Sequence, residues 1–362
     1  FGVLQKERLI DESKEIKIKE EEEEEVKEEK EKIVAPETEF VSAVRYVARV
    51  NGNIYQSFVD KIDERKFSST VIPKVYEVFF GNSAGSVIMS HLIASNSEVI
   101  ESFVGTLPKE VLGEDLTEEN KTTLSFLPEN ILDVSLLNSQ INSQAFYLLK
   151  TSDGVIGRIL NLLDNTKVQV FDSQFSEWLS GWPNQEIVTL TTKPSAQVSG
   201  YMYTLNTRNH ELKRVLGPIR GLTILMSPDS KSILYSDNNL SLKVQKMQGE
   251  TQTGEVSTME LRTLPEKCVW STNSQVFYCA VPKLVPSGEH PDSWYQGEIS
   301  FSDQFWKVDL ENGINLILAN PPEILSDPKE EIDGIKLALD EKENYLFFIN
   351  KKDSFLWALK LQ

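Results

Sequence analysis

Two cysteines, Cys268 and Cys279, form the clearest chemical pattern in this 362-residue chain. They bracket the segment CVWSTNSQVFYC, whose apolar ends and polar middle predict a hairpin with its loop at 271–276. Directly opposed cysteines on antiparallel strands lie within reach of a disulfide bond. The spacing therefore favours a disulfide, which would imply an oxidising compartment. Two buried thiols, or two metal ligands, are the alternatives.

A long insertion at 282–304, PKLVPSGEHPDSWYQGEISFSDQ, interrupts another predicted hairpin. Loops of this length in compact domains are often functional. The insertion carries His290 and the adjacent Trp294 and Tyr295, and exposed Trp and Tyr side chains are typical anchors for protein or sugar partners. It therefore predicts a partner-binding surface, which requires Trp294 to be at least partly exposed. The alternative is that Trp294 packs against the neighbouring strands.

A second aromatic motif, SEWLSGWPN, places Trp178 and Trp182 on either side of Gly181. The same two interpretations apply to this pair. Trp178 and Trp182 are further candidates for partner binding, and a packing role is the favoured alternative because a large aromatic side chain is more often part of a core.

The rest of the chain gives no motif for metal or nucleophilic chemistry. Only three histidines and two cysteines are present, and no spacing groups them as zinc ligands. A P-loop and a dinucleotide fingerprint are missing from the sequence, and the Gly-X-Ser-X-Gly match at 81–85 lies in a predicted turn between two strands, not in the strand-to-helix turn of a nucleophile elbow. Asp229 and Asp340 fit turns, where aspartate is common. The sequence therefore assigns no catalytic residue, no metal and no cofactor, and it leaves open whether the protein is an enzyme.

Composition excludes some classes of partner. Lys and Arg number 37 against 55 Asp and Glu, which gives a net charge of −18. Such a charge disfavours binding to nucleic acid or to an anionic membrane surface. No apolar run is long enough to span a membrane. Hydrophobic residues make up 40% of the chain, enough for a sizeable core.

The first 40 residues differ from the rest in composition. Acidic residues and lysines dominate 11–32, and such a stretch cannot bury a core. We expect residues 1–40 to be a charged linker or stalk, part helix or disordered, and residues 1–35 not to pack on the following domain. The first residue is Phe, so we also expect an upstream signal or membrane anchor, and hence a domain displayed at the cell surface or in the envelope.

Residues 41–362 repeat a hairpin pattern with a period of about 40 to 60 residues, which is typical of β-propeller blades. We predict an all-β propeller with seven blades, with six or eight as alternatives. The first hairpin has no clear strand before it. Seven hairpins pair 44–50 with 54–58, 86–93 with 99–104, 145–149 with 155–160, 201–205 with 211–215, 232–235 with 241–246, 276–281 with 305–310, and 345–349 with 354–361. Six inner strands precede them at 75–80, 131–136, 187–190, 222–226, 268–271 and 335–339.

One repeat carries a family resemblance. The segment LTILMSPDSKSILYSDNNLSLKVQKM, residues 222–247, resembles a blade of TolB-type, WD-repeat-like propellers, in which a Ser-Pro-Asp turn joins the inner strand to the next. Asp340 stands at the matching place in the last repeat. Residues 41–362 also resemble anchored propeller proteins of unknown function from uncultivated small-genome bacteria. The resemblance implies the fold and says little about function.

These features lead to three hypotheses for function. The first is a non-enzymatic binding or scaffold propeller, monomeric and outside the cytoplasm, that engages a protein or a glycan through its rim loops. The second is a glycan-active hydrolase or lyase with its site in the central channel. The third is an envelope accessory protein of TolB type. Paired carboxylates with an Arg or His in the channel would favour the enzyme. A lining of apolar and small polar groups would favour binding.

Overall fold

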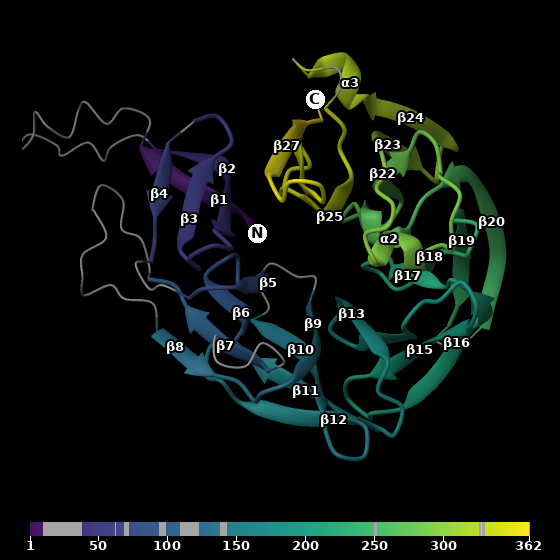
Figure 1. The fold of residues 1–362 in the computed structure, drawn as a ribbon, viewed down its shortest axis with the longest axis horizontal. Helices are drawn as coiled ribbons and strands as arrows, with labels where there is room; N and C mark the ends of the chain where they lie inside the picture. Colours follow the sequence, from purple (N-terminus) through teal and green to yellow (C-terminus); the bar gives the residue numbers. More distant parts are fainter. Residues whose placement is uncertain are drawn as a thin grey trace, which may run out of the picture.

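The structure is a computed structural model that describes residues 1–9, 38–61, 63–68, 72–93, 99–108, 123–137, 143–249, 252–325, 327 and 330–361. Within these residues, seven antiparallel sheets stand around a common centre like the blades of a propeller (Figure 1). Each blade takes its strands in chain order, starting from the strand nearest the centre. The prediction of an all-β, seven-bladed propeller is confirmed.

The first four blades each have four described strands. They are β1 (Gly2–Leu9), β2 (Thr38–Val47), β3 (Ile54–Phe58) and β4 (Glu64–Lys66); β5 (Val75–Gly81), β6 (Ser86–Leu92), β7 (Ile100–Thr106) and β8 (Thr123–Phe126); β9 (Ile131–Leu136), β10 (Gln144–Lys150), β11 (Val155–Asn161) and β12 (Lys167–Ser173); and β13 (Trp178–Asn184), β14 (Ile187–Thr192), β15 (Ser199–Asn206) and β16 (Leu212–Arg220).

The last three blades also include three short helices. The elements are β17 (Thr223–Met226), β18 (Ser232–Ser236), β19 (Ser241–Gln248) and β20 (Gln252–Arg262); the 3₁₀ helix η2 (Pro265–Lys267), β21 (Cys268–Trp270), β22 (Val276–Pro282), α2 (Asp292–Tyr295), β23 (Asp303–Asp309) and β24 (Ile314–Ala319); and α3 (Pro321–Ile324), β25 (Gly334–Leu339), β26 (Tyr345–Asn350) and β27 (Leu356–Lys360).

The hydrophobic core lies between neighbouring blades. Because successive residues of a strand point to opposite faces of its sheet, each blade presents apolar side chains to both neighbours. Blades 3 and 4 meet through Phe146 and Leu190, and blades 5 and 6 meet through Leu234 and Phe277. The ring therefore supplies each blade with the second half of its core, which a single sheet lacks.

Two turns bear out the TolB-type resemblance. The Ser227-Pro228-Asp229 turn joins β17 to β18, and the hydroxyl of Ser227 donates to Asp229 Oδ1 over 2.6 Å. In the last blade, the backbone N–H of Tyr345 donates to Asp340 Oδ1 over 2.6 Å, while Ser42 Oγ of the first blade donates to Asp340 Oδ2 over 2.8 Å. Asp340 thus shapes its own turn and links the last blade to the first.

The N-terminal residues differ from the prediction. Residues 2–9 form β1, the inner strand of the first blade, and pair with β2 along their whole length. Arg8 donates to both carboxylate oxygens of Asp60, over 2.8 and 2.6 Å. The prediction of a charged linker over 1–40 is therefore wrong for residues 2–9, which belong to the first blade. Charged residues of β1 such as Arg8 pair with residues distant in the sequence, and composition cannot reveal such pairs. The acidic run at 11–32 lies outside the described residues.

The fourth blade is also shifted relative to the prediction. The expected inner strand at 187–190 is the second strand, β14, and the inner strand is β13, which contains the motif WLSGWPN. The motif was not predicted as a strand because it contains Gly181 and Pro183, which are more typical of loops. Proline is tolerated here because one edge of an inner strand faces the channel and needs no ladder partner.

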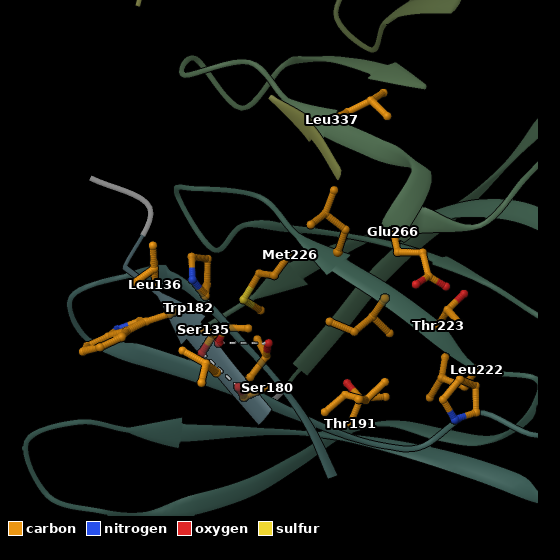
Figure 2. A pocket seen from close by; sticks show the side chains of 18 of the residues that line it. Ser135, Leu136, Ser180, Trp182, Thr191, Leu222, Thr223, Met226, Glu266 and Leu337 are labelled. Atoms are coloured by element: carbon orange, nitrogen blue, oxygen red, sulfur yellow. Dashed lines mark hydrogen bonds between the residues drawn. The ribbon is translucent and has the colours of Figure 1, made fainter. Parts of the chain in front are cut away.

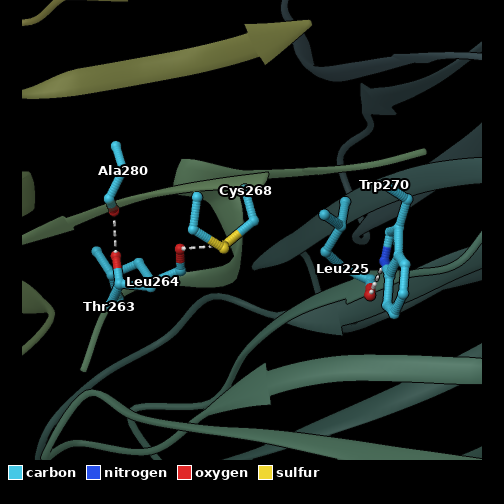
Figure 3. The surroundings of a disulfide bond; sticks show 7 residues. Leu225, Thr263, Leu264, Cys268, Trp270 and Ala280 are labelled. Carbon is cyan, nitrogen blue, oxygen red and sulfur yellow. Dashed lines mark hydrogen bonds between the residues drawn. A yellow bond between two sulfur atoms is a disulfide. The ribbon is translucent and has the colours of Figure 1, made fainter. Parts of the chain in front are cut away.

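Cys268 and Cys279 form the predicted disulfide bond (Figure 3). They are directly opposed in the register of β21 and β22, with their Cα atoms 4.1 Å apart. Both are buried, in the core layer between blades 5 and 6. The disulfide therefore ties the inner strand of blade 6 to the strand beside it.

We predict that replacing both cysteines by alanine lowers the free energy of unfolding by about 2 to 3 kcal/mol, since the closed loop is short. Urea denaturation of the oxidised wild type and of the double variant measures the difference. Non-reducing mass spectrometry of the peptide that spans both residues should show a single linked species. Two thiols that react with iodoacetamide in protein purified from an oxidising compartment would contradict the prediction.

Candidate functional site

A cavity of about 520 Å³ occupies the centre of the ring (Figure 2). The inner strands of five blades contribute to its wall, and consecutive residues of one strand, such as 134–136 of β9, line it together. The described lining residues are Phe79, Val134, Ser135, Leu136, Leu179, Ser180, Gly181, Trp182, Pro183, Thr189, Thr191, Pro194, Leu222, Thr223, Ile224, Leu225, Met226, Glu266, Tyr295 and Leu337.

The lining is mostly apolar, with a few hydroxyl groups. The hydroxyls of Ser135 and Ser180 lie 3.0 Å apart on adjacent inner strands (Figure 2). Asp133 fixes this pair, because its Oδ2 accepts from both the backbone N–H and the hydroxyl of Ser180, each over 2.6 Å. Burial raises the pKa of Asp133 to about 7, even though the bonds from Ser180 act in the opposite direction.

We predict that the stability of wild type falls as pH rises because Asp133 loses its proton, and that Asp133→Asn does not show this fall. The native pKa of about 7 exceeds the ordinary 3.8, so the native state binds more protons than the unfolded state between these values. Wild-type stability should therefore fall from about pH 4 to about pH 7, while the amide keeps an acceptor for Ser180. Melting temperatures across this range test it. The variant should melt higher at about pH 8 and match wild type near pH 4. Parallel curves would contradict the prediction.

Part of the cavity wall comes from two helices outside the inner strands. Glu266 of η2 and Tyr295 of α2 both line it, and the Tyr295 hydroxyl donates to Glu266 Oε1. The surrounding protein raises the pKa of Glu266 to about 6, although its side chain faces the open channel. Burial of the hydroxyl and the Glu266 charge together raise the pKa of Tyr295. The pair offers a ligand both a proton donor and an acceptor.

The structure buries four of the five predicted partner-binding residues. Only Tyr295, 41% exposed, is accessible. Trp294 is 4% exposed, so the expectation of an exposed Trp294 anchor is wrong. Its indole stacks on Phe301 with ring centroids 6.0 Å apart, and Nε1 donates to Asp333 Oδ2 over 2.9 Å. The other buried predictions are His290, Trp178 and Trp182, of which Trp182 also reaches the cavity.

Sequence reasoning missed the groups that the ring brings together. Ser135 and Ser180 lie 45 residues apart in the chain, and their strands belong to different blades. A buried cluster of Lys267, Asp303 and Asp333 likewise joins residues that no local motif connects. The signal that the sequence did offer was the Pro-rich insertion. It indicated the segment that forms α2, but it suggested that Trp294 is exposed, whereas Trp294 is buried.

In the part of the chain that the structure describes, no three or more His, Cys, Asp and Glu side chains are grouped closely enough to hold a metal ion. Helices that could cross a bilayer are likewise absent from the described segments. The three histidines lie apart in the fold. His91 contacts Glu101 over 2.9 Å, His290 contacts the carbonyl of Pro286 over 2.9 Å, and His210 lies in the turn before β16.

No protein-family model and no curated protein matches the chain. Among solved structures, a functionally unknown protein from Desulfotomaculum acetoxidans DSM 771 is 11% identical over 88% of this chain and 92% of that chain, with a TM-score of 0.53. An oligogalacturonate lyase in complex with manganese is 8% identical over 86% of this chain and 83% of that chain, with a TM-score of 0.56. TolB from Acinetobacter baumannii is 11% identical over 75% of this chain, with a TM-score of 0.46, and the chain spans 62% of TolB. At these identities, what the chain shares with such proteins is its fold.

Proposed function

We propose that this protein is a non-enzymatic binding propeller, a monomer in the envelope or at the cell surface, whose central channel receives a segment of a protein or a neutral glycan. The lining of the cavity carries this proposal. It combines apolar side chains with Ser and Thr hydroxyls, and Glu266 is the one charged group among the described residues that line it. Such a mixture suits binding of an uncharged or cationic segment.

The chemistry of the channel argues for binding over catalysis. An enzyme acting on glycans needs paired carboxylates close to the scissile bond, or a cation to stabilise developing negative charge. Among the described lining residues, Glu266 has no carboxylate partner, and its hydrogen-bond partner there is the hydroxyl of Tyr295. An anionic sugar chain would also meet no Lys or Arg in this lining. Likeness to an oligogalacturonate lyase at 8% identity supports the fold alone.

The disulfide supports the proposed location. Cys268 and Cys279 are bonded and buried. Structural disulfides persist in oxidising compartments such as the periplasm or the cell surface, and they are rare in the cytosol.

Arrays of peptides and neutral glycans, probed with the purified chain, test the proposal. Ligands found on the arrays are then titrated against wild type, Tyr295→Ala and Leu284→Ala. Leu284 belongs to the same insertion but is 78% exposed and does not line the cavity. We expect Tyr295→Ala to weaken binding about tenfold or more, and Leu284→Ala to leave it unchanged.

Two results would overturn the proposal. Equal affinity of wild type and Tyr295→Ala would place the ligand outside the channel. Turnover of oligogalacturonate or another glycan by wild type, measured as newly formed unsaturated or reducing ends, would show an enzyme.

A further inference from the structure

Three charged side chains meet in the interior beside the insertion. Lys267 ends η2, Asp303 begins β23, and Asp333 directly precedes β25. All three are 0% exposed. Lys267 Nζ lies 2.8 Å from Asp303 Oδ2 and also contacts Asp333 Oδ1. An amine and two carboxyl groups thus share one site that is closed to bulk solvent.

Aromatic rings enclose the amine. Lys267 Nζ is 5.3 Å from the centroid of the Trp294 ring and 5.2 Å from that of the Phe301 ring. These rings and the burial of the lysine stem hold Nζ in place beside the two carboxyl groups. Contact at hydrogen-bond distance also supplies the proximity that accelerates a reaction between two groups.

The two carboxyl groups differ in their environments. Asp333 Oδ2 accepts from Trp294 Nε1 over 2.9 Å and from the backbone N–H of Phe301 over 3.1 Å. Although burial alone would raise the pKa of Asp333, Lys267 and these donors lower it. Asp333 is therefore the carboxylate of the pair.

Asp303 takes up a proton more readily than Asp333. Burial raises its pKa to about 6. Its Oδ2 accepts from the backbone N–H of Gly334 over 2.7 Å, whereas no described residue gives its buried Oδ1 a hydrogen bond. Oδ2 is thus held by Gly334 and Lys267, and Oδ1 is the oxygen of Asp303 at which a proton meets no competing donor. With Asp303 protonated, the positive charge on Lys267 is balanced by the negative charge on Asp333.

We propose that Lys267 and Asp303 condense without a cofactor to form an isopeptide bond, with Asp333 as the catalytic acid and base. Lys267 passes one proton to Asp333, and the neutral amine attacks Cγ of the protonated Asp303. The N–H of Gly334 stabilises the negative charge that develops on Oδ2. The amine loses a second proton, Oδ1 gains one and leaves as water, and the carbonyl forms again. The products are an amide, one water molecule and protonated Asp333, so atoms and charge balance.

The cross-link would tie the end of the insertion to η2. It would join η2 to the start of β23, while the disulfide already joins β21 to β22 in the same blade. Blade 6 would then carry two covalent links that start at adjacent residues, Lys267 and Cys268, and neither bond depends on a bound ligand.

Intact mass spectrometry of the reduced full chain tests the proposal. We expect a mass lower than the sequence mass by one water molecule, and a single branched peptide that joins the sequences around Lys267 and Asp303 after proteolysis. Asp333→Asn and Lys267→Met should each show the mass calculated from its own sequence, with no loss of water. Lys243, which pairs with Asp237 over 2.7 Å in a partly exposed site, serves as the internal control and should give no branched peptide.

Three outcomes overturn the proposal. The first is a wild-type chain with the full sequence mass, a result that needs no variant to fold. The second is a water loss confined to a linear peptide at Asp333-Gly334, which would be a cyclic imide and is removed by hydroxylamine. The third is a branch at Asp333, which would overturn the assignment of Asp303 as the electrophile.

Discussion

Lys267→Met is expected to lower the free energy of unfolding by about 3 to 5 kcal/mol, because it leaves two buried carboxyl groups without the amine that contacts both, and it also removes the proposed cross-link. Asp303 and Asp333 would keep their buried positions without that nitrogen as a partner. Methionine preserves most of the volume of the lysine stem, so packing between Trp294 and Phe301 changes little. Urea denaturation monitored by circular dichroism gives the difference.

Two further variants separate charge from packing. Lys243→Met removes a cation that is 25% exposed and pairs with Asp237, and we expect a cost below about 1 kcal/mol. Adding Asp303→Asn and Asp333→Asn to Lys267→Met replaces the two carboxyl groups left without the amine by neutral amides and should recover part of the lost stability. A Lys267→Met variant as stable as Lys243→Met would contradict the prediction and would show that the cluster contributes little to the fold.

The fold could be predicted because each blade is encoded locally. A strand, a polar turn and a second strand recur along the chain, as at 75–80 and 86–93, which became β5 and β6. The pairing of Cys268 with Cys279 was equally local, since both belong to one hairpin. Hydrophobic alternation and turn residues carry this information within about ten residues, so a single sequence is sufficient for it.

Strands that break the local pattern were not predictable. Residues 2–9 carry charges such as Arg8, which becomes acceptable in a strand because Asp60 and Glu39 lie beside it in the folded chain. The motif at 178–184 contains Gly181 and Pro183, which are typical of loops, and it forms a strand because one edge faces the channel. In both segments tertiary structure outweighs local propensity.

The candidate site was beyond sequence reasoning for a related reason. The cavity takes its wall from the inner strands of blades 2, 3, 4, 5 and 7 and from two helices of blade 6. Neighbouring wall groups such as Ser135 and Ser180 are therefore separated by a whole blade in the chain. A propeller places its chemistry at the convergence of repeats, and no spacing within one repeat encodes that convergence.

The burial of Trp294 gives the insertion a structural role as well as its contribution to the channel. Four groups hold this side chain: Phe301 stacks on it, Asp333 accepts from Nε1, Lys267 lies over its ring, and Lys351 Nζ lies 3.9 Å from the ring centroid. Tyr295, the next residue, reaches the cavity. The packing of Trp294 therefore positions Tyr295 at the proposed binding site.

Trp294→Ala is accordingly expected to cost about 3 to 5 kcal/mol of stability, the range for replacing a buried aromatic residue with alanine. The change leaves a cavity and removes the indole donor of Asp333. Leu284→Ala, in the same insertion and 78% exposed, should stay within about 0.5 kcal/mol of wild type. Trp294→Phe should fall between them, because it keeps a ring and loses the hydrogen bond. Near-wild-type stability of Trp294→Ala would mean that α2 is not anchored by this side chain. The channel wall at Tyr295 would then have to be positioned by other contacts, such as the Glu266 hydrogen bond.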